Sequence, residues 1–164
     1  MEWIQHGERS PYDSDWVSPR LVDVEVPGGP RFDHHVTRLP RPAAGVVFAD
    51  VERGVLLLWR HRFITGTWGW EVPAGGVDVG EGPAQAAARK VLEETGWAPG
   101  PLRFLHCYHP TDGLSDQRFE LFVVDGATHV GEPSDPGESE RVEWLPAARV
   151  RQLVRSGASP TGCR

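Results

Sequence analysis

The sequence is poor in cysteine and in long apolar runs. Its two cysteines, Cys107 and Cys163, have neither the spacing of a metal site nor enough partners for a disulfide framework, so we expect a reducing, cytoplasmic location. No apolar run approaches the roughly 20 residues of a membrane span, and the N-terminal stretch MEWIQHGERS lacks the apolar core of a signal peptide. These absences predict a protein without a membrane partner.

An excess of positive charge is absent too. The formal net charge of the 164 residues is −6, whereas nucleic-acid binding requires a basic surface that contacts phosphates. We therefore expect no nucleic-acid partner. The length suits one domain that buries its own core, and the 19 glycines and 15 prolines predict many turns between short elements.

Short apolar runs predict strands through most of the chain. Because strands and helices do not alternate regularly, we predict an α/β (α+β) fold in which a mixed β-sheet is sandwiched between helices. Residues 131–140, polar and rich in proline, are predicted to form a loop that moves freely and does not pack. The expected strands cover 21–26, 31–38, 43–50, 54–61, 68–72, 102–109, 118–125 and 141–146, and helices are expected at 84–95 and from 147 onward.

Residues 75–97, GGVDVGEGPAQAAARKVLEETGW, place acidic side chains around a helix bounded by glycines. Lys90, Glu93 and Glu94 converge on one patch because they are three and four positions apart. By itself, this patch is either a solvated face on which Lys90 pairs with Glu94, or a site for a hard cation such as Mg²⁺. Helical spacing predicts a buried stripe of Ala84, Ala87, Ala88, Val91, Leu92 and Thr95.

The same segment resembles the Nudix box, G-x5-E-x7-R-E-U-x-E-E-x-G-U, in which U is apolar. Lys90 stands where the family has glutamate. The preceding stretch GTWGWEVPAGG and the N-terminal hairpins resemble the ADP-ribose pyrophosphatase branch of the family. The residues that match the box are Gly75, Glu81, Arg89, Val91, Glu93, Glu94, Gly96 and Trp97.

This resemblance implies a Nudix fold with an N-terminal β-strand extension. The extension, residues 1–40, is expected to be a dimerisation element, because members of this branch are commonly homodimers built through their N-terminal strands. The Nudix hydrolase domain is expected at 41–158 and a frayed tail at 159–164. We therefore expect a homodimer.

The resemblance further implies a metal site for Mg²⁺ or Mn²⁺. Its expected ligands are Glu93, Glu94 and the backbone carbonyl of Ala74, with Glu94 the more direct ligand. Supporting residues surround them: Arg89 is expected to orient the glutamates, and Glu81 either braces the loop and helix or binds metal. Gly75 is expected to let the loop fold tightly, and Gly96 suits the end of the helix.

Lys90 changes what the site can do. A protonated lysine donates hydrogen bonds and accepts none, so its ammonium is expected to bridge Glu93 and Glu94 in place of a cation. The chain then hydrolyses with fewer metal ions, uses another base, or binds nucleotides as an impaired or regulatory module. In this branch a glutamate from a mobile loop acts on the water, which makes Glu138 and Glu140 candidates unless both are solvated.

The substrate side is expected after the strand at 54–61. Arg62 and Arg60 lie where the family places basic residues near substrate phosphates, and Arg62 is preferred because arginine binds phosphate through two N–H groups. Glu71 matches a glutamate that contacts substrate or the neighbouring subunit. The expected substrate is a nucleoside diphosphate linked to another moiety, ADP-ribose or nucleotide-sugar-like. The triplet TDG at 111–113 replaces the usual S-P-G and disfavours ADP-ribose itself.

Overall fold

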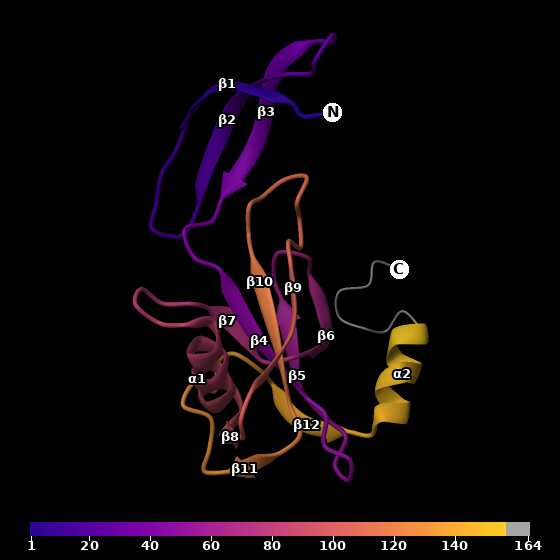
Figure 1. Cartoon of the computed structure of the whole chain (residues 1–164). Coiled ribbons are helices and arrows are strands. Elements are labelled where there is room, and N and C mark those ends of the chain that lie inside the picture. Colours follow the sequence, from indigo (N-terminus) through magenta and orange to yellow (C-terminus); the bar gives the residue numbers. More distant parts are fainter. Residues whose placement is uncertain (157–164) are drawn as a thin grey trace. The chain divides into compact units, whose positions relative to one another are not determined.

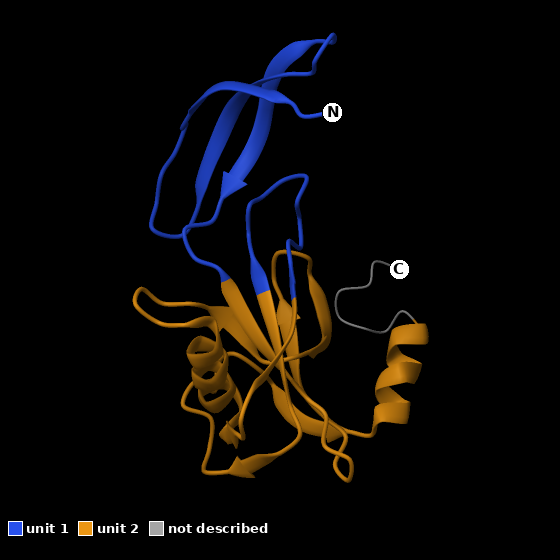
Figure 2. Ribbon diagram, viewed as in Figure 1, with its two compact units in different colours: residues 1–42, 107–119 blue, residues 43–106, 120–164 orange. Residues whose placement is uncertain are grey.

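The chain falls into two compact units (Figure 2). The computed structural model describes residues 1–156. Unit 1 contains residues 1–42 and 107–119, and unit 2 contains residues 43–106 together with the chain from residue 120 onward. The predicted frayed tail at 159–164 and Cys163 lie outside the described residues.

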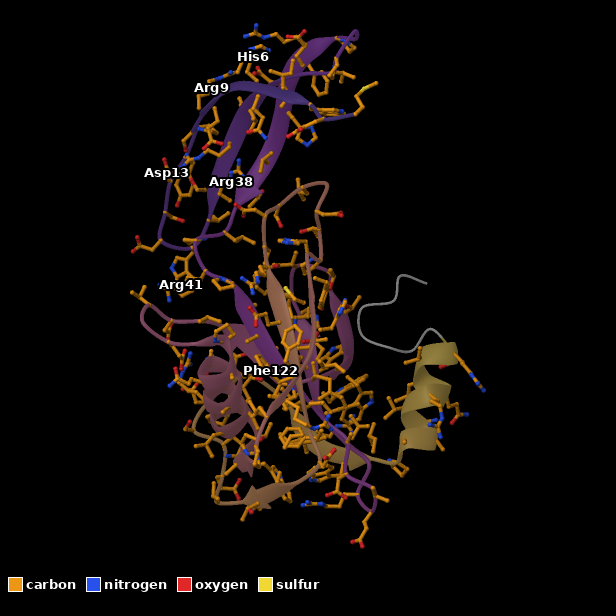
Figure 3. All side chains as sticks on the ribbon, in the orientation of Figure 1. His6, Arg9, Asp13, Arg38, Arg41 and Phe122 are labelled. Carbon is orange, nitrogen blue, oxygen red and sulfur yellow. The ribbon has the colours of Figure 1, made fainter. Side chains whose placement is uncertain are left out.

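Unit 1 is built on an antiparallel sheet in the order β1-β2-β3, with bounds Ile4–Arg9, Ser18–Glu25 and Arg31–Arg38 (Figure 1). The turn PGGP joins β2 to β3, and its Gly28 has a φ of 73°, which side-chain-bearing residues rarely adopt. Ion pairs connect the strands across their exposed surface, for example from Arg9 of β1, labelled in Figure 3, to Asp33 of β3 at 2.9 Å. Every residue of β1 is exposed, so this edge of the sheet is uncovered within the described chain.

The remaining strands form three further sheets. β11 (Ala127–His129) pairs with β8 (Trp97–Pro99). The two larger sheets have the orders β7-β4-β10-β9 and β12-β5-β6. Their strands are β4 (Ala43–Phe48), β5 (Val55–Arg62), β6 (Thr67–Glu71), β7 (Ala74–Gly76), β9 (Arg103–Tyr108), β10 (Phe119–Val124) and β12 (Arg141–Leu145).

Helix α1 (Pro83–Thr95) has the ends that its sequence predicts. Pro83 stands in the first turn, where its missing N–H costs nothing. Gly96 adopts a φ of 71° and donates its N–H to the Leu92 carbonyl at 2.9 Å, which closes the helix. The predicted buried stripe is wrong at Ala84 and Leu92, which are exposed, and Ala88 is only half-buried. The helix buries Ala86, Ala87, Val91, Glu94 and Thr95 instead.

The core of unit 2 lies between α1 and the central strands. Val91 and Ala87 of the helix are fully buried against apolar side chains of β4, β5 and β10, such as Phe48 and Leu56. Burial of this kind stabilises a fold by roughly 25 cal/mol per Å² of apolar surface. The helix that carries the acidic residues is therefore fixed by the apolar packing of Ala87 and Val91.

Strand β5 presents two different faces. Leu56, Leu58 and Arg60 share one face by alternation, and all three are buried. The other face carries Trp59, whose ring lies 5.2 Å from that of Trp70 on β6. Arg60 is thus delivered to the buried side of the strand, in line with the two leucines.

Helix α2 (Ala147–Arg155) buries none of its side chains. The described residues form several sheets and two helices, which confirms the predicted α+β class. Within residues 1–156, neither helix combines the length and apolar character that crossing a bilayer would demand.

Candidate active site

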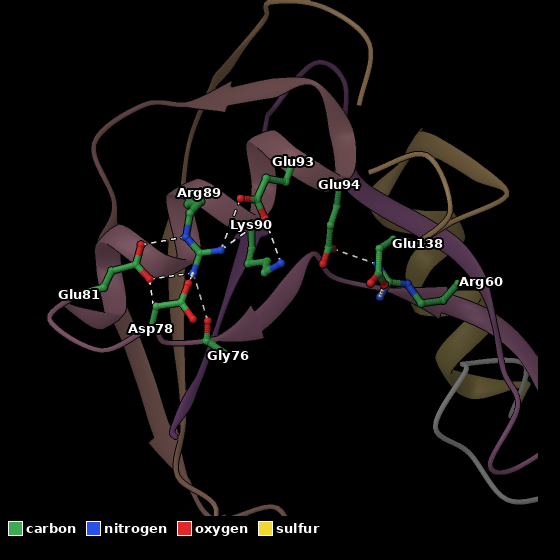
Figure 4. Close-up of polar contacts among 9 residues, drawn as sticks. All are labelled: Arg60, Gly76, Asp78, Glu81, Arg89, Lys90, Glu93, Glu94 and Glu138. Atoms are coloured by element: carbon green, nitrogen blue, oxygen red, sulfur yellow. Dashed lines mark hydrogen bonds and ion pairs between the residues drawn. The ribbon is translucent and has the colours of Figure 1, made fainter. Parts of the chain in front are cut away.

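The loop before α1 is braced by Arg89 (Figure 4). The Arg89 guanidinium donates to both carboxylate oxygens of Glu81, at 2.9 and 2.7 Å, and to the Gly76 carbonyl at 3.3 Å. Glu81 also accepts the Asp78 backbone N–H at 3.2 Å, and the hydrogen bond from Arg89 lowers the pKa of Glu81. These contacts favour the bracing role for Glu81 over a metal-binding one. A carboxylate oxygen of Asp78, which no sequence pattern singled out, lies 3.1 Å from the Arg89 Nη2.

Lys90 forms an ion pair with Glu93 rather than with Glu94. Its Nζ lies 2.9 Å from the Glu93 carboxylate, which also accepts from Arg89 at 3.3 Å. Burial raises the pKa of Glu93, but Lys90 and Arg89 outweigh that effect and leave the pKa below its usual value. The hydrogen bond to Glu93 raises the pKa of Lys90, so the ammonium stays charged. The predictions that Lys90 pairs with Glu94 or bridges the two glutamates are therefore wrong.

The Lys90 stem packs on the glycine loop, and this contact gives a testable prediction. A Cβ added at Gly75 would lie 2.7 Å from both Cδ and Cε of Lys90. We expect Gly75→Ala to lower the free energy of unfolding by about 1–3 kcal/mol, because overpacking displaces the lysine. Urea unfolding measures this loss.

The matched control is Gly76→Ala, since a Cβ at Gly76 meets no described atom within 4 Å. The Lys90→Ala background should relieve most of the cost of the Gly75 substitution, because the clashing stem is then gone. Equal losses at Gly75 in both backgrounds would show that the strain has another origin.

Glu94 points into the protein and meets Arg60. The side chains are 3% and 4% exposed, and the Arg60 Nη2 lies 2.9 Å from the Glu94 carboxylate. Burial raises the pKa of Glu94, and Arg60 only partly offsets that rise. The pair lies on the apolar side of β5, where the charge on Glu94 is compensated by a side chain distant in sequence.

Arg60 also contacts a loop glutamate. Its Nη1 lies 3.3 Å from the Glu138 carboxylate. Among the described residues, the side chain of Glu140 forms no ion pair with Arg60. Arg62, preferred from the sequence, instead pairs with Glu71 at 3.0 Å on the exposed end of β5, which raises the pKa of Arg62. The structure therefore brings Arg60, Glu94 and Glu138 together and leaves Arg62 and Glu71 as a neighbouring pair.

The segment 131–140 is anchored by backbone hydrogen bonds, although none of its residues is buried. The Asp135 N–H donates to the Glu93 carbonyl at 3.1 Å, and the Glu140 N–H donates to the Trp59 carbonyl at 2.9 Å. The segment is thus held to α1 at Asp135 and to β5 at Glu140.

The carboxylates suit a hard cation, but in limited number. Carboxylate oxygens are the ligands that Mg²⁺ prefers, and Glu93 and Glu94 occupy adjacent positions of α1. Ala74, the other expected ligand, begins β7, which packs against α1. Within residues 1–156 no group of three or more His, Cys, Asp or Glu side chains could hold a metal ion. In this structure Lys90 pairs with Glu93 and Arg60 pairs with Glu94, so a cation would compete with these two ion pairs for the carboxylates.

Comparison with known proteins decides the family. The family model described as the NUDIX domain matches residues 39–161. The chain belongs to the Nudix family. This membership confirms the resemblance seen in the box residues, and Nudix hydrolases act on phosphoanhydride bonds and generally use divalent metal ions.

Two relatives and one solved structure are similar to this chain. A CMP-5'-(N-acetyl-N-hydroxy-3-aminopropyl)phosphonate hydrolase from Streptomyces rubellomurinus is 40% identical over 161 residues, which covers 98% of this chain and 78% of the relative. An ADP-ribose pyrophosphatase from Mycobacterium tuberculosis is 29% identical over 141 residues, which covers 84% of this chain and 68% of the relative. A solved structure described as an ADP compounds hydrolase matches with a TM-score of 0.82 at 20% identity, covering 94% of this chain and 84% of that one, and shows the shared Nudix fold.

Proposed function

We propose that this Nudix hydrolase cleaves the phosphoanhydride of a nucleotide joined to a second phosphorus-bearing group, with nucleotide-linked phosphonates and nucleoside diphosphate conjugates as the substrate class. The observation that carries the proposal is the site itself: Glu93, Glu94 and Glu138 lie around the Nudix helix with Arg60 between two of them. The S. rubellomurinus relative, whose name specifies a CMP-linked phosphonate, supports this substrate class.

In the proposed reaction, water attacks phosphorus and the bridging anhydride oxygen leaves with the electron pair of the broken P–O bond. Glu138 takes the proton of the water, because its exposed carboxylate can reach solvent beside Glu94. Glu93, Glu94 and the Ala74 carbonyl would hold a divalent ion. When bound, such an ion, Mg²⁺ or Mn²⁺, neutralises charge on the phosphate oxygens. Arg62 and Glu71 would lie beside the bound substrate.

A panel of conjugates tests this proposal. The purified chain is incubated with a CMP-linked phosphonate, ADP-ribose and nucleotide sugars, with Mg²⁺, with Mn²⁺ and with a chelator, and the products are separated by chromatography. We expect nucleoside monophosphate as a product with the phosphonate conjugate, and its loss with the chelator. Absence of turnover for every conjugate and both metals would contradict the proposed activity.

A second candidate function is a module that binds such a nucleotide without cleaving it. The observation in its favour is that Lys90 and Arg60 already neutralise the two box glutamates. Thermal stabilisation by a conjugate, independent of metal and without turnover, would support this module against the hydrolase. Stabilisation that needs metal and comes with turnover would exclude it.

The N-terminal sheet supports a homodimer. All six residues of β1 are exposed, and Trp3 and Ile4 at its start are each 47% exposed. An uncovered edge strand offers unpaired backbone groups to a second chain. We expect light scattering during size exclusion to give the mass of a dimer, and a monomer mass at the concentrations of the assay would contradict this.

A further inference from the structure

Arg60 occupies an unusual position for a charged residue. It is 4% exposed, and it uses two different nitrogens for two carboxylates: Nη2 lies 2.9 Å from Glu94 and Nη1 lies 3.3 Å from Glu138. The guanidinium is planar and its donors are fixed relative to one another. The two carboxylates, one on each Nη, are therefore held in fixed directions relative to each other.

The local structure fixes Arg60 itself. Strand β5 is paired on both sides, with β12 and with β6, so its backbone has no freedom to slide. The residue directly opposite Arg60 on β6 is Gly69. Within residues 1–156 the Arg60 Nε has no hydrogen-bond partner, and it lies 3.9 Å from a carboxylate oxygen of Glu71.

The loop of Glu138 is held differently. Backbone hydrogen bonds fix it at Asp135 and at Glu140. Between these anchors, Glu138 has one backbone hydrogen bond, to the Asp135 carbonyl at 3.3 Å, and a side chain that is 43% exposed. The contact with Arg60 is thus the interaction that directs the Glu138 carboxylate toward Glu94 (Figure 4).

We propose that Arg60 is a positioning residue, which ties the loop 131–140 to the Nudix helix by holding Glu138 beside Glu94. Two carboxylates repel each other at short range, and the guanidinium between them removes that repulsion. The assignment of Glu138 as the acceptor of the water proton rests on the proposed function. The positioning by Arg60 does not, and it can be measured without substrate.

Hydrogen exchange followed by mass spectrometry tests the positioning in the whole chain. In Glu138→Ala, which leaves the buried Arg60–Glu94 pair intact, we expect amides of the peptide 136–139 to exchange about tenfold faster. Arg60→Lys should have a similar effect, because a single ammonium retains one carboxylate but does not hold both in fixed directions. Glu132→Ala, an exposed glutamate of the same loop, and Arg103→Lys, an exposed arginine of β9, are the matched controls.

The double variant Arg60→Lys with Glu138→Ala decides the mechanism. If Arg60 acts through Glu138, the double variant exchanges no faster than either single variant. Unchanged exchange in both single variants, or effects that multiply in the double variant, would overturn the proposal.

A kinetic arm separates this inference from the proposed function. With a cleaved conjugate, both single variants should lower kcat by the same factor, with little change in KM and no further loss in the double variant. Faster loop exchange with an unaltered kcat in Glu138→Ala would support the positioning while removing Glu138 as the proton acceptor. If the wild-type chain cleaves no conjugate, the exchange cycle still decides the role of Arg60.

Discussion

Replacing Lys90 by glutamate is expected to raise the rate of metal-supported hydrolysis by about tenfold or more, equivalent to ~1.4 kcal/mol of activation free energy. The substitution removes the ammonium that lies 2.9 Å from Glu93 and supplies a further carboxylate on the same turn of α1. A divalent ion then competes with no lysine for Glu93, and it gains an oxygen ligand. Nucleotide release from a conjugate, measured for wild type and Lys90→Glu across a range of Mg²⁺ concentrations, gives the change.

Lys90→Gln separates the two causes. It removes the positive charge without adding a carboxylate, so we expect a rate between those of wild type and Lys90→Glu. The gain in both variants should vanish with a chelator. A wild-type chain already as fast as Lys90→Glu would refute the idea that the lysine weakens catalysis.

Glu94→Gln is expected to lower the rate of hydrolysis by about 100-fold or more, because it weakens the binding of a metal ion whose charge stabilisation is worth several kcal/mol. Glutamine keeps the size of the side chain and one acceptor for Arg60, but it carries no negative charge for a cation. Initial rates with saturating metal and conjugate measure the loss. Glu132→Gln, on the exposed part of the loop, is the matched control.

This substitution also affects stability. Glu94 and Arg60 are both almost fully buried, and weakening a hydrogen bond between charged groups costs about 1.5–3 kcal/mol. Assays must therefore be made well below the Tm of the variant, measured in parallel. A folded Glu94→Gln protein with wild-type activity would exclude Glu94 from the reaction.

The elements with a strong local sequence pattern were predicted correctly. The helix α1 was predictable because Pro83 and Gly96 mark its ends and apolar residues recur between them. The strand Arg31–Arg38 follows a turn with two glycines and was placed at its true bounds. The strands β7, β8 and β11 were missed, since three residues are too few to show a period. β1 was missed because it buries nothing and has no apolar alternation.

The candidate site was predictable in membership but not in pairing. The box spacing identified Glu93 and Glu94, yet Glu94 meets Arg60 across 34 positions of sequence, and a helical wheel cannot reveal such a partner. For this reason the predicted stripe included Leu92 and left out Glu94. The sequence did contain a signal for Arg60, which lies on the same face of the strand as Leu56 and Leu58. Arg62 lies on that face too, but beyond the buried part of β5.

Lys90 is the only lysine in the 164-residue chain, and its side chain is 23% exposed. Amine-directed acylating reagents therefore have a single side-chain target, apart from the α-amino group. The mass gained on the peptide that contains Lys90 would report whether the space beside Glu93 is open or filled. The residue that departs from the Nudix box thus gives the protein a chemical footprint of its own active site, without any introduced label.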